Sequence, residues 1–148
     1  MNKYISIGEF QDHLKNYYNL FNIKLNFLEL SKYLYDNNFL SSTYNKSIFL
    51  NLDDNLNDKE FFNLLNKYPL EINLNQITSN NHEVCEDDII PSKNDVYIIK
   101  HFRYLKNQLH KHNYFEINYL YKGSCNFYFE KDYKVLKEGE LCIISPLS

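Results

Sequence analysis

The sequence predicts an α+β protein: an N-terminal helical region followed by an antiparallel, incomplete β-barrel. Up to about residue 80, apolar residues recur every three or four positions, which is the period of a helix. From Asp95 onward, apolar and aromatic residues alternate with polar ones in short runs, which is the period of a strand. A polar, acidic stretch typical of a surface connection separates the two patterns. We therefore divide the chain into a mainly helical region (1–80), a linker (81–94) and a β-region (95–148).

Three helices are expected in the first region. The apolar spacing predicts one helix from Phe10 to Phe21 and a second over residues 26–35. The third has the clearest signals, because Asn57 can cap its start and Glu60, three residues later, can complete a capping box. Pro69 is expected to end this helix.

Short β-branched and aromatic runs fill the β-region and are separated by turn residues. Gly123 and the pair Lys131–Asp132 suit tight connections between neighbouring strands. About five successive strands, each a hairpin away from the last, indicate an antiparallel sandwich or barrel. The expected runs cover residues 96–105, 112–123, 124–132, 133–140 and 141–146.

Composition and charge narrow the class of protein. The net charge of −3 and the scattered Lys residues give no basic patch for nucleic acid. The three cysteines lack C-x-x-C spacing and are expected to be reduced thiols of a cytoplasmic protein. No run approaches the ~20 apolar residues of a membrane span, and no signal peptide is recognisable. We predict a cytoplasmic protein with no membrane partner.

The most informative stretch has the spacing H-x-H-x3-E-x6-G, formed by His110, His112, Glu116 and Gly123. On a strand, residues an even number of positions apart point to one face, so the two imidazoles and the carboxylate share a side. Such a set can hold a divalent metal. On a straight strand the Cα atoms of His112 and Glu116 would lie about 13 Å apart, so metal binding requires a twisted strand.

This spacing resembles the first conserved motif of the cupin superfamily, in which two His and one Glu are metal ligands in the enzyme members. The run from Gly139 to Pro146 resembles the start of the second cupin motif. That motif normally continues to a fourth ligand, a His a few residues after the Pro, and the sequence given ends at Ser148.

Over residues 95–148 the amino-acid sequence around these motifs is similar to that of sensor domains of AraC-type transcriptional regulators. The similar segments are residues 96–104, 112–117 and 121–124, with Leu136, Glu138–Gly139 and Ile144–Pro146 near the end. The resemblance implies a cupin half that binds a small effector or mediates dimerisation. It also implies a C-terminal domain with two helix-turn-helix units that reads DNA, and we expect that domain and the rest of the barrel to lie outside this chain.

The candidate ligand pocket contains six residues: His101, Arg103, His110, His112, Tyr114 and Glu116. Arg103 could bind a carboxylate through two parallel hydrogen bonds, because its planar guanidinium holds its N–H donors in a fixed geometry. An exposed strand face with ordinary salt bridges is the alternative for His101 and Arg103. For His110, His112 and Glu116 the alternatives are metal ligation and pocket lining. Regulator cupins usually lack a metal, so we predict no metal and no cofactor.

The resemblance implies a regulatory function and not an enzymatic one. No G-x-S-x-G elbow or Gly-rich phosphate loop is present, so the sequence gives no support for nucleophilic catalysis or for a phosphate-binding loop. The predicted partners are a small-molecule effector of unknown identity and a second copy of the chain in a homodimer. DNA would be bound only through the absent C-terminal domain. One alternative is a metal-dependent cupin enzyme of the dioxygenase or isomerase class. Another is a ligand-binding cupin with no DNA-binding partner.

Overall fold

The computed structural model describes residues 2–44, 56–75, 101–106, 113–129 and 131–146. The chain divides into two compact units, Met1–Asn107 and Gln108–Ser148, and each is described by itself. The described residues form three helices and six strands, and all the strand pairs are antiparallel. The α+β class is therefore confirmed. No closed barrel is present in the described part of the chain, so the cupin barrel stays a prediction.

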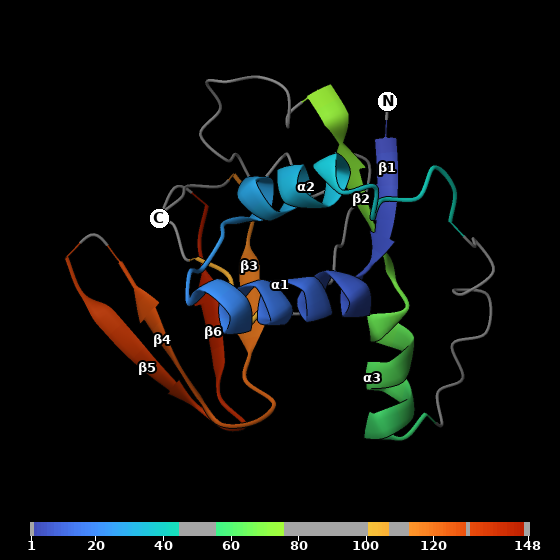
Figure 1. Ribbon diagram of the computed structural model, residues 1–148. Coiled ribbons are helices and arrows are strands. Elements are labelled where there is room, and N and C mark those ends of the chain that lie inside the picture. Colours follow the sequence, from blue (N-terminus) through green and yellow to red (C-terminus); the bar gives the residue numbers. More distant parts are fainter. Residues whose placement is uncertain (1, 45–55, 76–100, 107–112, 130, 147–148) are drawn as a thin grey trace. The chain divides into compact units, whose positions relative to one another are not determined.

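A small sheet joins the two ends of the helical region (Figure 1). Strand β1 (Asn2–Ser6) pairs antiparallel with β2 (Pro69–Asn73). On the other edge of β1, Tyr4 and Ser41 exchange backbone hydrogen bonds of 2.9 and 2.8 Å. The sequence pattern missed both strands, and Pro69, expected only to end a helix, is also the first residue of β2.

The three predicted helices are confirmed as α1 (Ile7–Phe21), α2 (Phe27–Asp36) and α3 (Asp58–Asn66). Each begins with a complete capping box, formed by the pairs Ser6/Glu9, Asn26/Glu29 and Asn57/Glu60. In each pair the first side chain accepts from the third-residue amide, and the Glu accepts from the cap amide, so two otherwise unpaired backbone donors are satisfied. The capping box predicted at Asn57 and Glu60 is therefore present.

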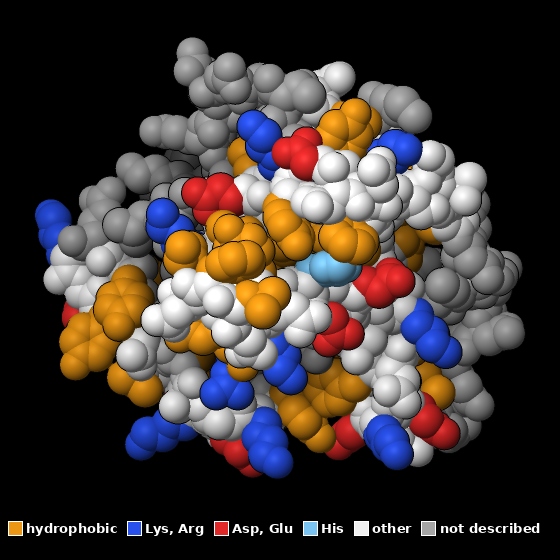
Figure 2. Space-filling model, in the orientation of Figure 1, with side chains coloured by type: hydrophobic (Ala, Val, Ile, Leu, Met, Phe, Trp, Pro, Cys, Tyr) orange, Lys and Arg blue, Asp and Glu red, His pale blue; other side chains and the backbone are white. Residues whose placement is uncertain are grey.

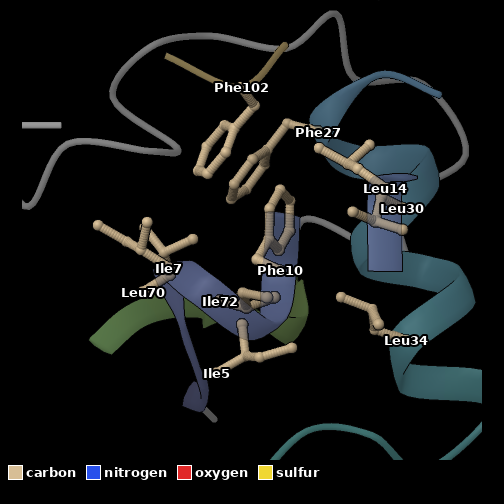
Figure 3. Packing of buried hydrophobic residues seen from close by; sticks show 10 residues of the cluster. All are labelled: Ile5, Ile7, Phe10, Leu14, Phe27, Leu30, Leu34, Leu70, Ile72 and Phe102. Carbon is tan, nitrogen blue, oxygen red and sulfur yellow. The ribbon is translucent and has the colours of Figure 1, made fainter. Parts of the chain in front are cut away.

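The core of this unit lies between α1, α2 and the small sheet (Figure 3). Phe10 is fully buried at its centre, and the ring centroids of Phe27 and Phe102 lie 5.1 and 5.0 Å from its own. The other members of the buried cluster are aliphatic: Ile5, Ile7, Leu14, Leu30, Leu34, Leu70 and Ile72. Phe102 comes from a segment distant in sequence, and its burial ties residues 101–106 to the helical core.

Residues 101–106 correct one prediction. They were expected to belong to the first barrel strand, but they form a turn in which the Leu105 amide donates to the Phe102 carbonyl at 3.1 Å. The Lys106 amide donates to the Leu25 carbonyl at 2.8 Å, which fixes the end of the turn to the loop before α2. Burial of Phe102 among helix side chains outweighs the β-propensity of the local sequence, because that propensity depends strongly on context.

The capping box of α1 makes the free energy of unfolding depend on pH, because it contains the carboxylate of Glu9. The Ser6 hydroxyl donates to the Glu9 carboxylate at 2.6 Å and the Ser6 amide donates at 3.1 Å. These bonds, the hydroxyl first, lower the pKa of Glu9, since both stabilise the charged carboxylate. The resulting stabilisation is fully present above the unfolded-state pKa, about 4.3 for Glu. It is lost as the pH falls through the lower folded-state pKa.

We expect Ser6→Ala to lower the free energy of unfolding by about 1 kcal/mol at neutral pH, as loss of an N-cap does. The difference from the parent protein should shrink as the pH falls below the unfolded-state pKa of Glu9. Urea denaturation followed by helical circular dichroism measures both effects. Glu9→Gln is the matched control, because its amide cannot titrate. A Ser6→Ala penalty that persists unchanged in acid would contradict the role given to the Glu9 carboxylate.

The second unit contains strands β3 (Glu116–Tyr119), β4 (Ser124–Tyr128), β5 (Tyr133–Lys137) and β6 (Leu141–Ile144). All four lie within the predicted runs. Their pairing differs from the expected succession of hairpins, because β3 pairs with β6 and only β4 and β5 form adjacent hairpin arms. The turn between β4 and β5 contains the predicted pair Lys131–Asp132, and the Phe129 amide donates to the Asp132 carbonyl at 2.8 Å.

The two ladders are successive parts of one long hairpin with an interruption in the middle (Figure 1). Four residues (120–123) connect β3 to β4, whereas three (138–140) connect β5 to β6. The extra residue gives a bulge-like offset. Leu120 donates to the Glu140 carbonyl at 3.0 Å and accepts from the Gly139 amide at 2.8 Å. Gly123 and Gly139 have φ values of 89° and 81°, a region that favours glycine.

Candidate functional site

The six predicted pocket residues do not form one described site. His101 and Arg103 belong to the first unit, whereas Tyr114 and Glu116 belong to the second. His110 and His112 lie outside the described residues. The grouping of all six in one pocket, and the metal set of His110, His112 and Glu116, therefore stay predictions.

Glu116 is the first residue of β3 and lies opposite Ile144 of β6. It is half-buried and shares its face of the ladder with the buried Asn118 and Cys142. Tyr114, just before the strand, is also half-buried. Within the described ranges, no group of three or more His, Cys, Asp or Glu side chains is arranged to hold a metal ion.

The opposite face of the same ladder is apolar and exposed. Ile117 lies directly across from Ile143, and Tyr119 across from Leu141, so all four side chains point to one side. They are 50–64% exposed, and Phe115, two residues before Ile117, is 68% exposed. We call these five residues the outer face. Monomeric proteins seldom expose a contiguous apolar patch larger than a few hundred Å², and larger ones mark interaction sites.

His101 and Arg103 line a groove in the first unit. The groove has a volume of about 240 Å³ and lies between α1 and the turn of residues 101–106. Helix α1 contributes Gln11, Asp12, Leu14 and Lys15, and the turn contributes His101, Phe102, Arg103 and Tyr104. From the sequence, His101 and Arg103 were candidate pocket residues on an expected strand, and no residue of α1 was a candidate.

Apolar side chains form the base of the groove and charged ones its rim. Leu14 is 2% exposed and Phe102 is 8% exposed, and both belong to the hydrophobic core (Figure 3). Lys15, His101 and Arg103 are exposed, as is one acidic residue, Asp12. The groove therefore combines an apolar base with basic groups, and it can bind a ligand with both characters.

Arg103 is held at this rim by an aromatic contact. Its guanidinium carbon lies 6.0 Å from the centre of the Tyr104 ring, within the range of a cation–π interaction. The Tyr104 ring in turn lies 5.3 Å from that of Tyr18 on α1. Over the described ranges, neither Arg103 nor Lys15 has a carboxylate within salt-bridge distance. Both cations are therefore available to an anionic ligand.

A strip of ring contacts follows the boundary between α1 and α2. The rings of His13, Phe39, Tyr33, Tyr17 and Phe21 contact one another in that order, with centroid distances of 4.4–6.3 Å. Figure 2 shows apolar side chains gathered over these two helices. Burial in this strip lowers the pKa of His13, although the carboxylates of Glu9 and Asp12 act in the opposite direction. We expect His13 to be largely neutral at neutral pH.

Comparison with protein-family models, with curated proteins and with solved structures found no match to this chain. In the described part of the chain, no helix is both long and apolar enough to cross a membrane. A functional assignment therefore rests on the residues and their arrangement.

Proposed function

We propose that this chain is the regulatory part of an AraC-type transcriptional regulator, which senses a small effector and pairs with a second copy of itself. The proposal begins with the resemblance of residues 95–148 to the sensor domains of that family. The observation that carries it is the structure of the resembling segment. Glu116 begins a strand, and Gly139, the first residue of the second motif, makes a left-handed turn just before another.

The negative charge of the chain supports placing DNA binding elsewhere. With a net charge of −3, phosphate contacts would lack the basic patch that dominates affinity for nucleic acid. The DNA-reading helices of the regulator would therefore belong to a domain outside this chain.

The outer face supports pairing with a second copy. An isolated two-stranded ribbon is only marginally stable in water, and it gains stability when its apolar face is covered. The exposed fractions of the five outer-face residues correspond to roughly 600 Å² of apolar surface, since a large aromatic side chain alone contributes ~150–250 Å². A standard interface buries about 800 Å² per partner, so this face and a polar rim suffice.

Charge also favours a second copy as the occupant. None of the five outer-face residues is charged, so two copies can meet without burying an unpaired ion. A two-fold axis through the face would place the same patch on both sides, as in most homodimers.

The test is sedimentation velocity of the chain at concentrations on the order of 1–100 µM. We expect a dimer, and we expect Ile117→Lys or Ile143→Lys to produce a monomer, because each buries a charge in an apolar interface. Ile23→Lys is the matched control, since Ile23 is 54% exposed in the first unit. Its dimer should persist.

Two outcomes would contradict the proposal. A parent chain that is monomeric throughout this range would remove the pairing role. Stoichiometric Fe, Mn, Ni or Zn in the purified protein, lost on His112→Ala, would instead favour the metal-dependent cupin enzyme.

A further inference from the structure

We infer that the groove between α1 and residues 101–106 binds a small organic monocarboxylate. The inference deepens the proposed sensing role by naming the chemical class of the effector, and to that extent it rests on the proposed function. The binding itself is carried by the shape and charge of the groove.

The inside of the groove favours an apolar body. Leu14 and Phe102 close the base of the groove, but they keep only 2% and 8% of their surface exposed and so offer little area to a ligand. The Tyr104 ring adds an aromatic wall. A ligand with an aromatic or aliphatic body would gain from covering this wall, in proportion to the apolar area removed from water.

The rim selects a carboxylate. Arg103 offers a planar fork that matches the two oxygens of a carboxylate, and its contact with Tyr104 limits the conformations it must lose on binding. Lys15 lines the same groove and adds a second positive charge. Arg103 is the single arginine of the chain. The one guanidinium of the molecule therefore lies where bidentate recognition would use it.

Asp12 and the size of the groove restrict the ligand further. A second carboxylate on the ligand would share the groove with the Asp12 carboxylate, and like charges at close range are unfavourable. The volume of about 240 Å³ is smaller than most drug-sized pockets. It corresponds to about eight water molecules at ~30 Å³ each, so the ligand should have about ten non-hydrogen atoms.

The experiment titrates the whole chain with phenylacetate and with phenylacetamide, a neutral analogue of the same shape. Backbone NMR shifts report both the affinity and the residues that respond. We expect phenylacetate to bind with a Kd on the order of 1 mM or below and to shift the amides of Gln11, Leu14 and Phe102. Phenylacetamide should bind about tenfold more weakly, because it lacks the charge that Arg103 recognises.

Substitutions at the rim identify the group responsible. Arg103→Gln should weaken phenylacetate binding about tenfold or more, and Arg103→Lys should have an intermediate effect, since it keeps the charge but loses the fork. Lys59→Gln on α3 removes an exposed charge that does not line the groove and should leave binding unchanged. Arg103 is exposed, so these variants should fold, and helical circular dichroism checks this.

Equal affinity for acid and amide, no effect of Arg103→Gln, or shifts confined to other surfaces would overturn the inference. Failure here is distinguishable from failure of the proposed function, because the oligomeric state is measured separately. A protein that is dimeric but does not bind phenylacetate would contradict only the inference about the groove. A protein that is monomeric but binds phenylacetate through Arg103 would support the inference about the groove and contradict the proposed dimerisation.

Discussion

Phe10→Ala should cost the first unit about 3–5 kcal/mol of unfolding free energy, the range measured for removing a buried Phe. Phe10 has no exposed surface, and its ring contacts both Phe27 of α2 and Phe102 of the turn. Its loss would leave a cavity between these three segments. Because a domain is stable by only about 5–15 kcal/mol, the variant should unfold at a much lower urea concentration.

Phe21→Ala is the control for this prediction, because it makes the same substitution in the same helix. Phe21 is 55% exposed and contacts the Tyr17 ring, so its removal should cost less than about 1 kcal/mol. Similar losses for the two variants would show that the ring cluster around Phe10 is not the centre of the core. Phe10→Ala should also weaken phenylacetate binding, since it removes the support beneath Phe102.

Leu136→Ala should have the second-largest effect, about 2–5 kcal/mol, and should act on the second unit. Leu136 lies on β5 opposite Cys125 and is 1% exposed. The ladders of this unit have two strands each, so little stability is available to absorb the loss. We expect the amides of β4 and β5 to lose protection from hydrogen exchange while those of α1 keep theirs.

The neighbouring Val135 provides the control for Leu136. It is 43% exposed and points to the other face of β5, so Val135→Ala should leave exchange protection nearly unchanged. Simultaneous loss of protection in α1 and β5 would contradict the separate stability of the two units.

The elements that the sequence predicted correctly are those with local signals. Helix α3 is specified by Asn57 and Glu60 at its start and by Pro69 soon after its end, all within one short segment. Strands β3 to β6 show the same local agreement between alternation and structure. Strands β1 and β2 were missed because each acquires its partner only when distant parts of the chain meet.

Long-range choices could not be predicted from the pattern. Alternation shows that β3 is a strand, but it does not show whether Gly123 reverses the chain or lets it continue. The pairing with β6 continues past the strand ends through backbone hydrogen bonds between Leu120 and residues 139–140. Residues 101–106 read locally as a strand because nothing in that segment reveals the ring of Phe10, far earlier in the sequence, against which Phe102 packs.

The candidate site shows the same division. The expectation that Arg103 would recognise a carboxylate follows from its side-chain chemistry and is kept in the groove proposal. Its neighbours Asp12 and Lys15 could not be identified in advance, because on α1 they resemble an ordinary solvated helix face. Their relation to Arg103 arises from the tertiary contacts of the turn, among them the packing of Phe102 against Phe10 and of Tyr104 against Tyr18.

The connection of residues 120–123 is one residue longer than the connection of residues 138–140, and this difference limits the length of the apolar face on the hairpin. Strand side chains alternate with a period of two, so across this step one arm exchanges its inward and outward positions relative to the other. Odd-numbered residues pair with odd-numbered ones in the β3–β6 ladder, but with even-numbered ones in the β4–β5 ladder. The apolar face shared by β3 and β6 therefore cannot continue on both arms into β4 and β5. Self-association through this face would therefore be limited to the length of β3 and β6. The bulge-like step would also disfavour aggregation by addition of further strands at the edges.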